Sequence, residues 1–130
     1  MQTIMRAETR SVAIAAPPEA VHSYLADGAN LPVWAPGFAP AVRADGSSWI
    51  VISAAGEFRV DVIARAGART VDVVSADDHT RGLFARVLPS GDGSELLFSL
   101  LFAPDTPEGE VEAQMVTLEA ELAAVRGACE

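Results

Sequence analysis

The last part of the chain carries one continuous apolar stripe at helical spacing. Between residues 107 and 126, the large apolar side chains follow one another at intervals of four, three, four and three residues: Val111, Met115, Leu118, Leu122 and Val125. This spacing places them on one side of an α-helix, and most of the charged residues fall on other sides. A helix of roughly 30 Å with one apolar side must pack that side against another element. The only available partner is the part of the chain that precedes it.

That preceding part alternates between short strand patterns and turn signals. The clearest alternation starts at Gly56, where Phe58, Val60 and Val62 face one way and mainly charged residues face the other. Consecutive strands are expected over residues 39–44, 48–53, 56–65, 69–75, 83–88 and 95–103. Because the turns between them are short, these strands should form an antiparallel meander.

The beginning of the chain adds a strand and a helix. A strand is expected over residues 6–15, and Pro17-Pro18 then starts a helix that ends near Gly28. One further helical turn is expected over residues 31–34. The expected caps are Asn30 for this turn and Asp105 or Thr106 for the final helix. The order strand, helix, turn, meander and long helix predicts an α+β fold, in which a curved antiparallel sheet holds the final helix.

Length and charge narrow the classes of protein. The 130 residues suit a single domain, 1–130, with its own core. The net charge is −9, there is no lysine, and the nine arginines are scattered among acidic residues. Proteins that neutralise phosphates need clustered cations, so nucleic acid and anionic membranes are excluded as partners.

Other features exclude further classes. No apolar run is long enough to span a membrane, and the first residues lack the pattern of a signal peptide, so a cytoplasmic protein without membrane insertion is expected. His79, Asp77 and Asp78 share one turn and lack the spacing of a metal site. No dinucleotide or phosphate-binding motif occurs, and neither a cofactor nor a metal is expected. Cys129 is the only cysteine and cannot form an internal disulfide.

Several stretches, in this order and spacing, match a known superfamily over nearly the whole chain. They are residues 12–27 with Ala-Pro-Pro-Glu-Ala-Val and Tyr-Leu-Ala-Asp, then Asn30-Leu31-Pro32-Val33-Trp34, Thr70-Val71-Asp72, the stretch 85–95 around Gly91-Asp92-Gly93, and Leu118-Glu119-Ala120-Glu121-Leu122. The chain resembles the START-like (SRPBCC) superfamily, which includes polyketide cyclases, START lipid-transfer domains and the birch-pollen allergen family. It looks most like the small bacterial cyclase/dehydrase-like proteins.

The resemblance implies the helix-grip fold, with a cavity between the curved sheet and the C-terminal helix. It also implies a small hydrophobic or aromatic ligand, polyketide-like or lipid-like. It does not supply a catalytic set, because members of the superfamily have many different activities on one fold. Trp34 and the glycine-rich turn are structural signatures of the resemblance.

Strand parity and the helix stripe predict which residues would line such a cavity. The inward strand faces contribute Phe58, Val60, Phe98, Leu100 and Phe102. The helix contributes Met115, Leu118 and Leu122, and Trp34 and Phe38 form the rim. Tyr24 either places its hydroxyl at the pocket or is a core residue with a solvated tip. The alternative for the whole set is a solid core, since regular apolar stripes usually reflect packing.

Two polar residues are catalytic candidates. Arg86 shares strand parity with Phe84, so both enter the cavity if that face turns inward, and the guanidinium could then bind a carboxylate or enolate. Asp72, if inward, would be a buried carboxylate suited to act as a general base. The alternative is that Leu83, Ala85 and Val87 point inward, with Arg86 pairing across the hairpin with Glu95 and Asp72 lying outside near Arg59 or Arg65.

Three hypotheses follow. The first is a protein that binds a small hydrophobic molecule between sheet and helix, with cyclisation or dehydration if it is an enzyme. The second is a carrier with the same pocket and no chemistry. The third is a solid-core interaction protein whose acidic surface contacts a partner. A monomer and a homodimer are equally compatible with the sequence.

Overall fold

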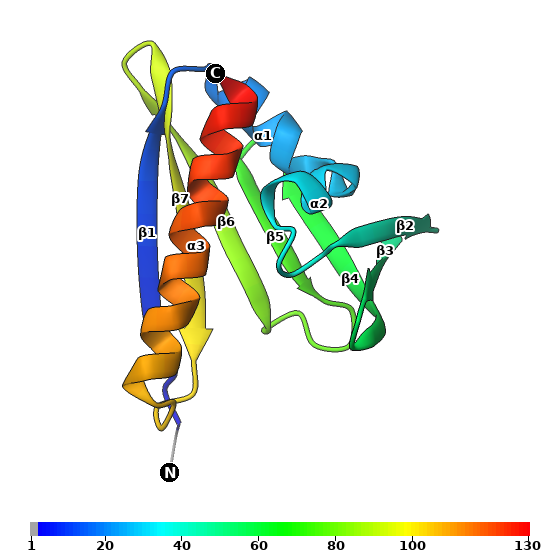
Figure 1. Ribbon diagram of the computed structural model, residues 1–130. Coiled ribbons are helices and arrows are strands. Elements are labelled where there is room, and N and C mark those ends of the chain that lie inside the picture. The colour runs from blue at the N-terminus through cyan, green and yellow to red at the C-terminus, as the bar shows by residue number, and fades with distance from the viewer. Residues whose placement is uncertain (1–2) are drawn as a thin grey trace.

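The computed structural model describes residues 3–130 and shows one curved seven-stranded sheet with its helices on one face (Figure 1). The elements are, in chain order, β1 (Arg6–Ile14), α1 (Pro18–Ala26), the 3-10 turn η1 (Gly28–Asn30), α2 (Leu31–Trp34), β2 (Ala41–Asp45), β3 (Ser48–Ser53), β4 (Gly56–Arg65), β5 (Thr70–Ser75), β6 (Gly82–Ser90), β7 (Gly93–Phe102) and α3 (Glu108–Cys129). The prediction of an α+β helix-grip fold is confirmed.

The sheet is an antiparallel meander closed by the first strand. Its spatial order is β1-β7-β6-β5-β4-β3-β2, so strands β2 to β7 pair in sequence and β1 returns to lie beside β7. The strands β3 and β4 begin and end where the alternation predicted. Strand β6 is longer than predicted, because Pro89 and Ser90 continue in register opposite Ser94 and Gly93. Gly91, at φ +56°, therefore turns a tighter hairpin than the sequence suggested.

Helix α3 runs along the sheet with its apolar stripe turned inward. Every member of the predicted stripe is buried: Val111, Met115, Leu118, Leu122 and Val125. The helix packs mainly over β1 and also contacts α1, α2 and β7. Helix α1 lies beside its C-terminal half and covers the same end of the sheet (Figure 1).

Both predicted helix caps are wrong. Pro107 is the residue before α3 and no side chain caps that end, because Thr106 lies one residue too early. The Pro107 carbonyl accepts from the backbone N–H groups of Glu110 and Val111 instead. At the other site, the Asp27 side chain accepts from Ala29 N at 3.0 Å to cap η1. Asn30 does not cap α2, since its Nδ2 donates to the Tyr24 carbonyl at 2.9 Å.

Gly28 allows η1 to approach strand β3 closely. A Cβ added at Gly28 would overlap the ring of Trp49, whereas a Cβ at Gly37 would meet open space. We expect Gly28→Ala to lower the free energy of unfolding by about 1–3 kcal/mol, as overpacking in a core does. Urea denaturation measures this change, with Gly37→Ala as the matched control. Equal stability of the two variants would show that the Trp49 ring moves aside freely.

Candidate functional site

On β6 and β7, burial of the apolar inner face falls from the end near α1 to the opposite end. Near α1, the inward side chains of the central strands are fully buried: Val71, Val87 and Leu96. Toward the opposite end, the inward side chains are only half-buried: Val62, Leu83, Leu100 and Phe102. We call this second set the open inner face. Its residues come from three strands, β4, β6 and β7. Three of them share one cross-strand row, in which Leu83 pairs with Leu100 and aligns through the buried Val73 of β5 with Val62.

Two aromatic pairs flank the open inner face. Trp34 packs against Phe98 with ring centroids 5.4 Å apart, and Phe38 meets Phe58 edge-on at 5.6 Å. The rings of Phe38 and Phe58 remain 39% and 42% exposed, respectively. Large apolar rings with this much exposure on a small protein are candidates for ligand contact.

The middle of the interface beneath α3 is packed rather than hollow. Trp34, Phe98, Leu118 and Leu122 are each at most 2% exposed, and Val60 is equally buried. The prediction that Trp34 lies at the rim is therefore wrong, because its ring is enclosed against Phe98. Phe38 lies exposed beside Phe58, and Phe58, expected on the inward wall of the cavity, is itself 42% exposed.

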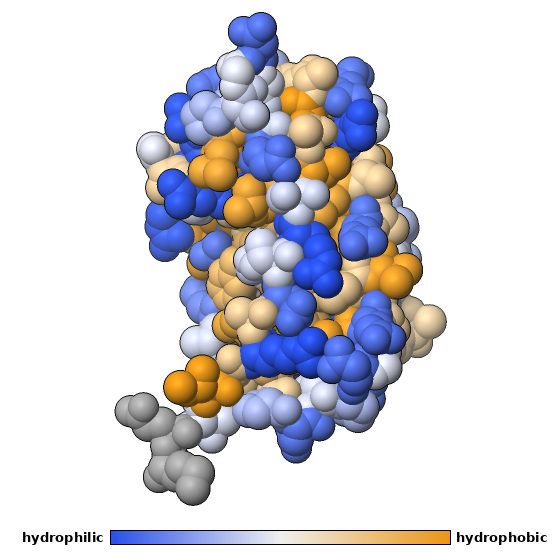
Figure 2. All heavy atoms as spheres, turned by 90° about the vertical axis from the view of Figure 1, so that its left-hand side faces the viewer, coloured by the Kyte–Doolittle hydropathy of each residue, from blue (hydrophilic) through white to orange (hydrophobic). Residues whose placement is uncertain are grey.

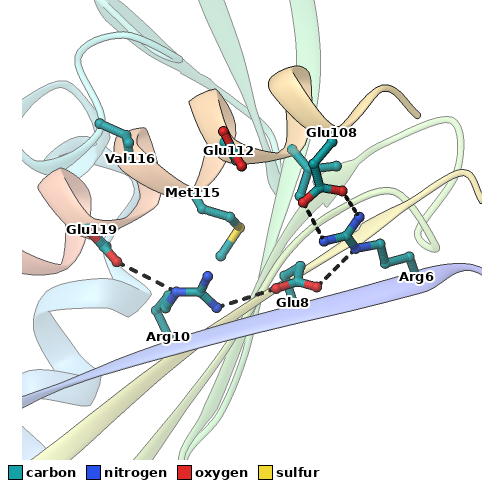
Figure 3. A pocket seen from close by; sticks show the side chains of 9 residues that line it. Arg6, Glu8, Arg10, Glu108, Glu112, Met115, Val116 and Glu119 are labelled. Atoms are coloured by element: carbon teal, nitrogen blue, oxygen red, sulfur yellow. Dashed lines mark hydrogen bonds and ion pairs between the residues drawn. The ribbon is translucent and has the colours of Figure 1, made fainter.

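A depression lies along the edge of the molecule, between β1 and the N-terminal half of α3 (Figure 3). This edge cleft has a volume of about 350 Å³, and its lining comprises Arg6, Glu8, Arg10, Glu108, Val111, Glu112, Met115, Val116 and Glu119. Figure 2, which faces this side of the molecule, shows a band of hydrophilic side chains with apolar residues between them.

The charges of the edge cleft mostly satisfy one another. Arg6 binds Glu108 through both terminal nitrogens at 2.6 and 3.2 Å and binds Glu8 through Nε at 3.0 Å. Arg10 lies 3.5 Å from both Glu8 and Glu119. The hydrogen bonds from Arg6 lower the pKa of Glu8 and of Glu108. These pairs tie the edge strand to the helix and leave neither guanidinium free for a ligand.

Sequence reasoning missed this charged cluster, although strand parity contained the signal. Arg6, Glu8 and Arg10 share parity with the inward residues Val12 and Ile14. Inward-pointing charges on an edge strand discourage pairing with another sheet. Arg10 Nη1 also donates to the Thr9 carbonyl at 2.9 Å, which occupies an acceptor that another strand could use.

The predicted catalytic residues lie on the outer face of the sheet. Leu83, Ala85 and Val87 point inward, so Arg86 and Phe84 point outward and cannot line a site beneath α3. The placement of Arg86 and Phe84 in the cavity is therefore wrong. Glu95 lies opposite Leu88 and is a diagonal neighbour of Arg86 on the outer face, but no ion pair joins the two side chains among residues 3–130.

Asp72 is on the outer face as well, because Val71 and Val73 on either side of it are buried in the core. Its Oδ2 lies 3.7 Å from Nη1 of Arg65. The inward position considered for Asp72 is wrong, and the alternative beside Arg65 is confirmed.

The two histidines have structural partners. His22 is buried, and its Nε2 lies 3.1 Å from the Thr70 carbonyl, which fixes α1 to β5. His79 Nε2 lies 2.7 Å from Asp61, which also accepts from the hydroxyl of Ser48. Asp61 stands between the other two residues, whereas a hydrolase triad has histidine in the middle, so this cluster does not form one.

Two buried polar atoms lack a hydrogen-bond partner among residues 3–130: the Tyr24 hydroxyl and Trp34 Nε1. Burial raises the pKa of Tyr24, and the nearby Cys129 adds a smaller effect in the same direction. Buried polar groups are nearly always paired, so each of these atoms calls for water or a ligand. Within the same residues, no group of three or more His, Cys, Asp or Glu side chains could hold a metal ion, and no helix is long and apolar enough to cross a membrane.

Glu121 of α3 is the titratable group most affected by burial, which raises its pKa from 4.5 to about 7. Below about pH 4.5 the carboxyl is protonated in both the folded and the unfolded chain. Between about 4.5 and 7 the unfolded chain loses this proton first, so the folded state loses relative stability as the pH rises.

We therefore expect Glu121→Gln to raise the free energy of unfolding at pH 8 by about 1–2 kcal/mol, a value reduced because the side chain remains partly exposed to solvent. The gain should disappear below pH 4.5. Denaturation between pH 4 and pH 8 measures it. Glu112→Gln, on the exposed side of the same helix, is the control and should show no comparable gain. A gain that is independent of pH would contradict the assignment to Glu121 ionisation.

No protein-family model matches the sequence, and no curated protein matches it either. Solved structures do match. The Zhui aromatase/cyclase from Streptomyces sp. R1128 is 16% identical with a TM-score of 0.67, over 97% of this chain and 94% of that chain. A START superfamily protein from Mycobacterium smegmatis is 17% identical with a TM-score of 0.66, over 95% of this chain and 96% of that chain.

A third similar structure is the Aha1 dimer from Colwellia psychrerythraea, which is 15% identical with a TM-score of 0.73 and matches over 97% of each chain. At these identities the likeness concerns the fold. The seven-stranded curved sheet and its long C-terminal helix superimpose on proteins of different function over nearly their whole length. The chain has the START-like helix-grip fold.

Proposed function

We propose that the protein binds a small hydrophobic or aromatic molecule, polyketide-like or lipid-like, between the sheet and α3. The observation that carries this proposal is the open inner face: Val62, Leu83, Leu100 and Phe102 are half-buried, whereas the inward residues of β6 and β7 nearer α1 are fully buried. A ligand that covers this surface gains about 25 cal/mol for each Å² of apolar area removed from water. The exposed pair Phe38–Phe58 supplies aromatic contacts at its border.

The chemistry of the open inner face supports binding without catalysis. Its four residues are apolar, and Arg86 and Asp72 lie on the opposite face of the sheet. The nearest inward carboxylate, Glu8 opposite Leu100, is held by Arg6 at 3.0 Å. General acid–base catalysis needs a titratable group within hydrogen-bond reach of the reacting atoms. A carrier is therefore our first choice, ahead of a cyclase or dehydrase. The similar structures include an aromatase/cyclase and a START superfamily protein, so the fold alone does not choose between the two roles.

Adjacent residues on β7 offer a matched test of the site. Leu100 belongs to the open inner face, and Leu101 points outward and is 43% exposed. We expect Leu100→Trp to fill the site and weaken binding of the neutral fluorescent probe N-phenyl-1-naphthylamine about tenfold or more, because it removes on the order of 1.4 kcal/mol of contacts. Leu101→Trp should leave the affinity within about twofold. Fluorescence titration measures both, and equal effects of the two variants would place the probe elsewhere.

The outer-face residues give a second prediction. Arg86→Ala and Asp72→Asn should each leave the affinity for the same probe unchanged, because neither side chain reaches the inner face. A loss of affinity in either variant, with the fold intact by circular dichroism, would contradict the proposed location of the site.

Native mass spectrometry of the protein purified from cells separates the carrier from an interaction protein with an acidic surface. The carrier should retain an apolar molecule that leaves on mild denaturation. A protein that is consistently empty and that binds no apolar probe would favour the interaction protein.

A further inference from the structure

Trp34 retains a hydrogen-bond donor that the protein does not use. Its side chain is 2% exposed, and Nε1 has no hydrogen-bond partner among the described residues. An indole nitrogen donates one hydrogen bond and accepts none. Because water is largely excluded from this position, the natural partner is an oxygen or nitrogen acceptor that arrives with a ligand or a single trapped water.

The position of Trp34 places this donor next to the proposed site. Its ring packs on Phe98, and Phe98 shares one face of β7 with Leu100, two residues further along the strand. The transition from full to partial burial lies between these two residues, with Phe98 at 0% exposure and Leu100 half-buried. A molecule that covers Leu100 and extends along β7 toward Phe98 would approach the aromatic pair that contains the unused donor.

The surroundings determine the kind of acceptor. The buried cluster around Trp34 consists of apolar side chains. The buried polar side chains of residues 3–130 are His22 and Ser94, and these bond to the carbonyls of Thr70 and Ala16, respectively. The nearest cation is Arg10, opposite Phe98 on β1, and it already lies 3.5 Å from Glu8 and from Glu119. A carboxylate ligand would therefore be poorly neutralised in this cluster, which is strongly unfavourable. An uncharged oxygen satisfies the donor without this penalty.

We infer that Trp34 determines ligand specificity by donating Nε1–H to an uncharged oxygen, such as a ketone or amide carbonyl, on an otherwise apolar or aromatic molecule. This inference rests on the proposed function. It narrows the ligand class from any apolar molecule to one that carries a neutral acceptor at its buried end.

Two probes of the same shape test the inference: 2-acetylnaphthalene and 2-isopropenylnaphthalene, which differ by C=O against C=CH2. The chain has two tryptophans, so a ¹⁵N-labelled sample gives two indole N–H signals in NMR spectra, and Trp34→Phe and Trp49→Phe assign them. We expect the Trp34 signal of the unmodified protein to move downfield with the acetyl probe and not with the isopropenyl probe. The Trp49 signal should respond equally weakly to both.

Affinities give an independent readout. In Trp34→Phe, the preference for the acetyl probe over the isopropenyl probe should fall about fivefold to tenfold, the amount expected for one neutral hydrogen bond. Trp49→Phe is the matched control, since it removes the same atoms from a ring that packs beside Gly28. Its preference should equal that of the unmodified protein. The charged analogue 2-naphthoate, at pH 8, should bind the unmodified protein about tenfold or more weakly than the ketone.

The possible failures are distinguishable. If both neutral probes bind while the Trp34 signal and the preference stay unchanged, a water holds the donor and the inference is overturned, although the proposed function stands. Binding of naphthoate as tight as that of the ketone overturns the restriction to uncharged acceptors. If neither neutral probe binds, the proposed function fails and the inference fails with it. The NMR measurement uses the unmodified protein, so it holds even if Trp34→Phe does not fold.

Discussion

The structure depends on the packing of the α3 stripe against the inner face of the sheet. Five large apolar side chains of α3 are buried there, and Phe98 and Leu96 of β7 are fully buried opposite them. Without this contact, both the helix and the concave face of the sheet would expose apolar surface. The remaining helices complete the cover at one end only. Since α1 and the C-terminal half of α3 meet there, the other end keeps apolar residues that nothing in residues 3–130 covers fully.

Helix α3 meets charged residues on the side of β1 and apolar residues on the side of the other strands. Toward β1, the helix is tied to the edge strand by ion pairs of Arg6 with Glu108 and of Arg10 with Glu119. Exposed pairs of this type contribute little to stability, typically about 0–1 kcal/mol each. These ion pairs hold α3 beside β1 and keep that side of the helix polar. Strand β7 and the strands beyond it present apolar residues instead, so the edge cleft and the proposed ligand site are separate features.

The residues that form the open inner face agree with the proposed carrier function. Its four residues are apolar, the Trp34 donor is unused, and Arg86 and Asp72 lie on the outer face, while the inward charges of β1 pair with one another and with α3. A binding site for drug-sized ligands is mostly apolar with a few fixed polar groups. Fold similarity alone could not decide between an enzyme and a carrier, because the same architecture occurs in an aromatase/cyclase and in other proteins.

The sequence by itself determined the elements and their order. The 3.6-residue stripe defined α3, and the alternation in β4 and the short turns defined the meander, because these periods follow from local geometry. Only the tertiary structure decided which strand face turned inward. Strand parity placed Arg86 and Ala85 on opposite faces of the sheet, and likewise Asp72 and Val71. The local pattern allowed either face to turn inward, and packing against α3 selected the apolar face. The uneven cover of the inner face and the unpaired Trp34 donor were also tertiary outcomes. They depend on where α1, α2 and α3 lie over the sheet, and such long-range placement leaves no mark in the spacing of residues along the chain.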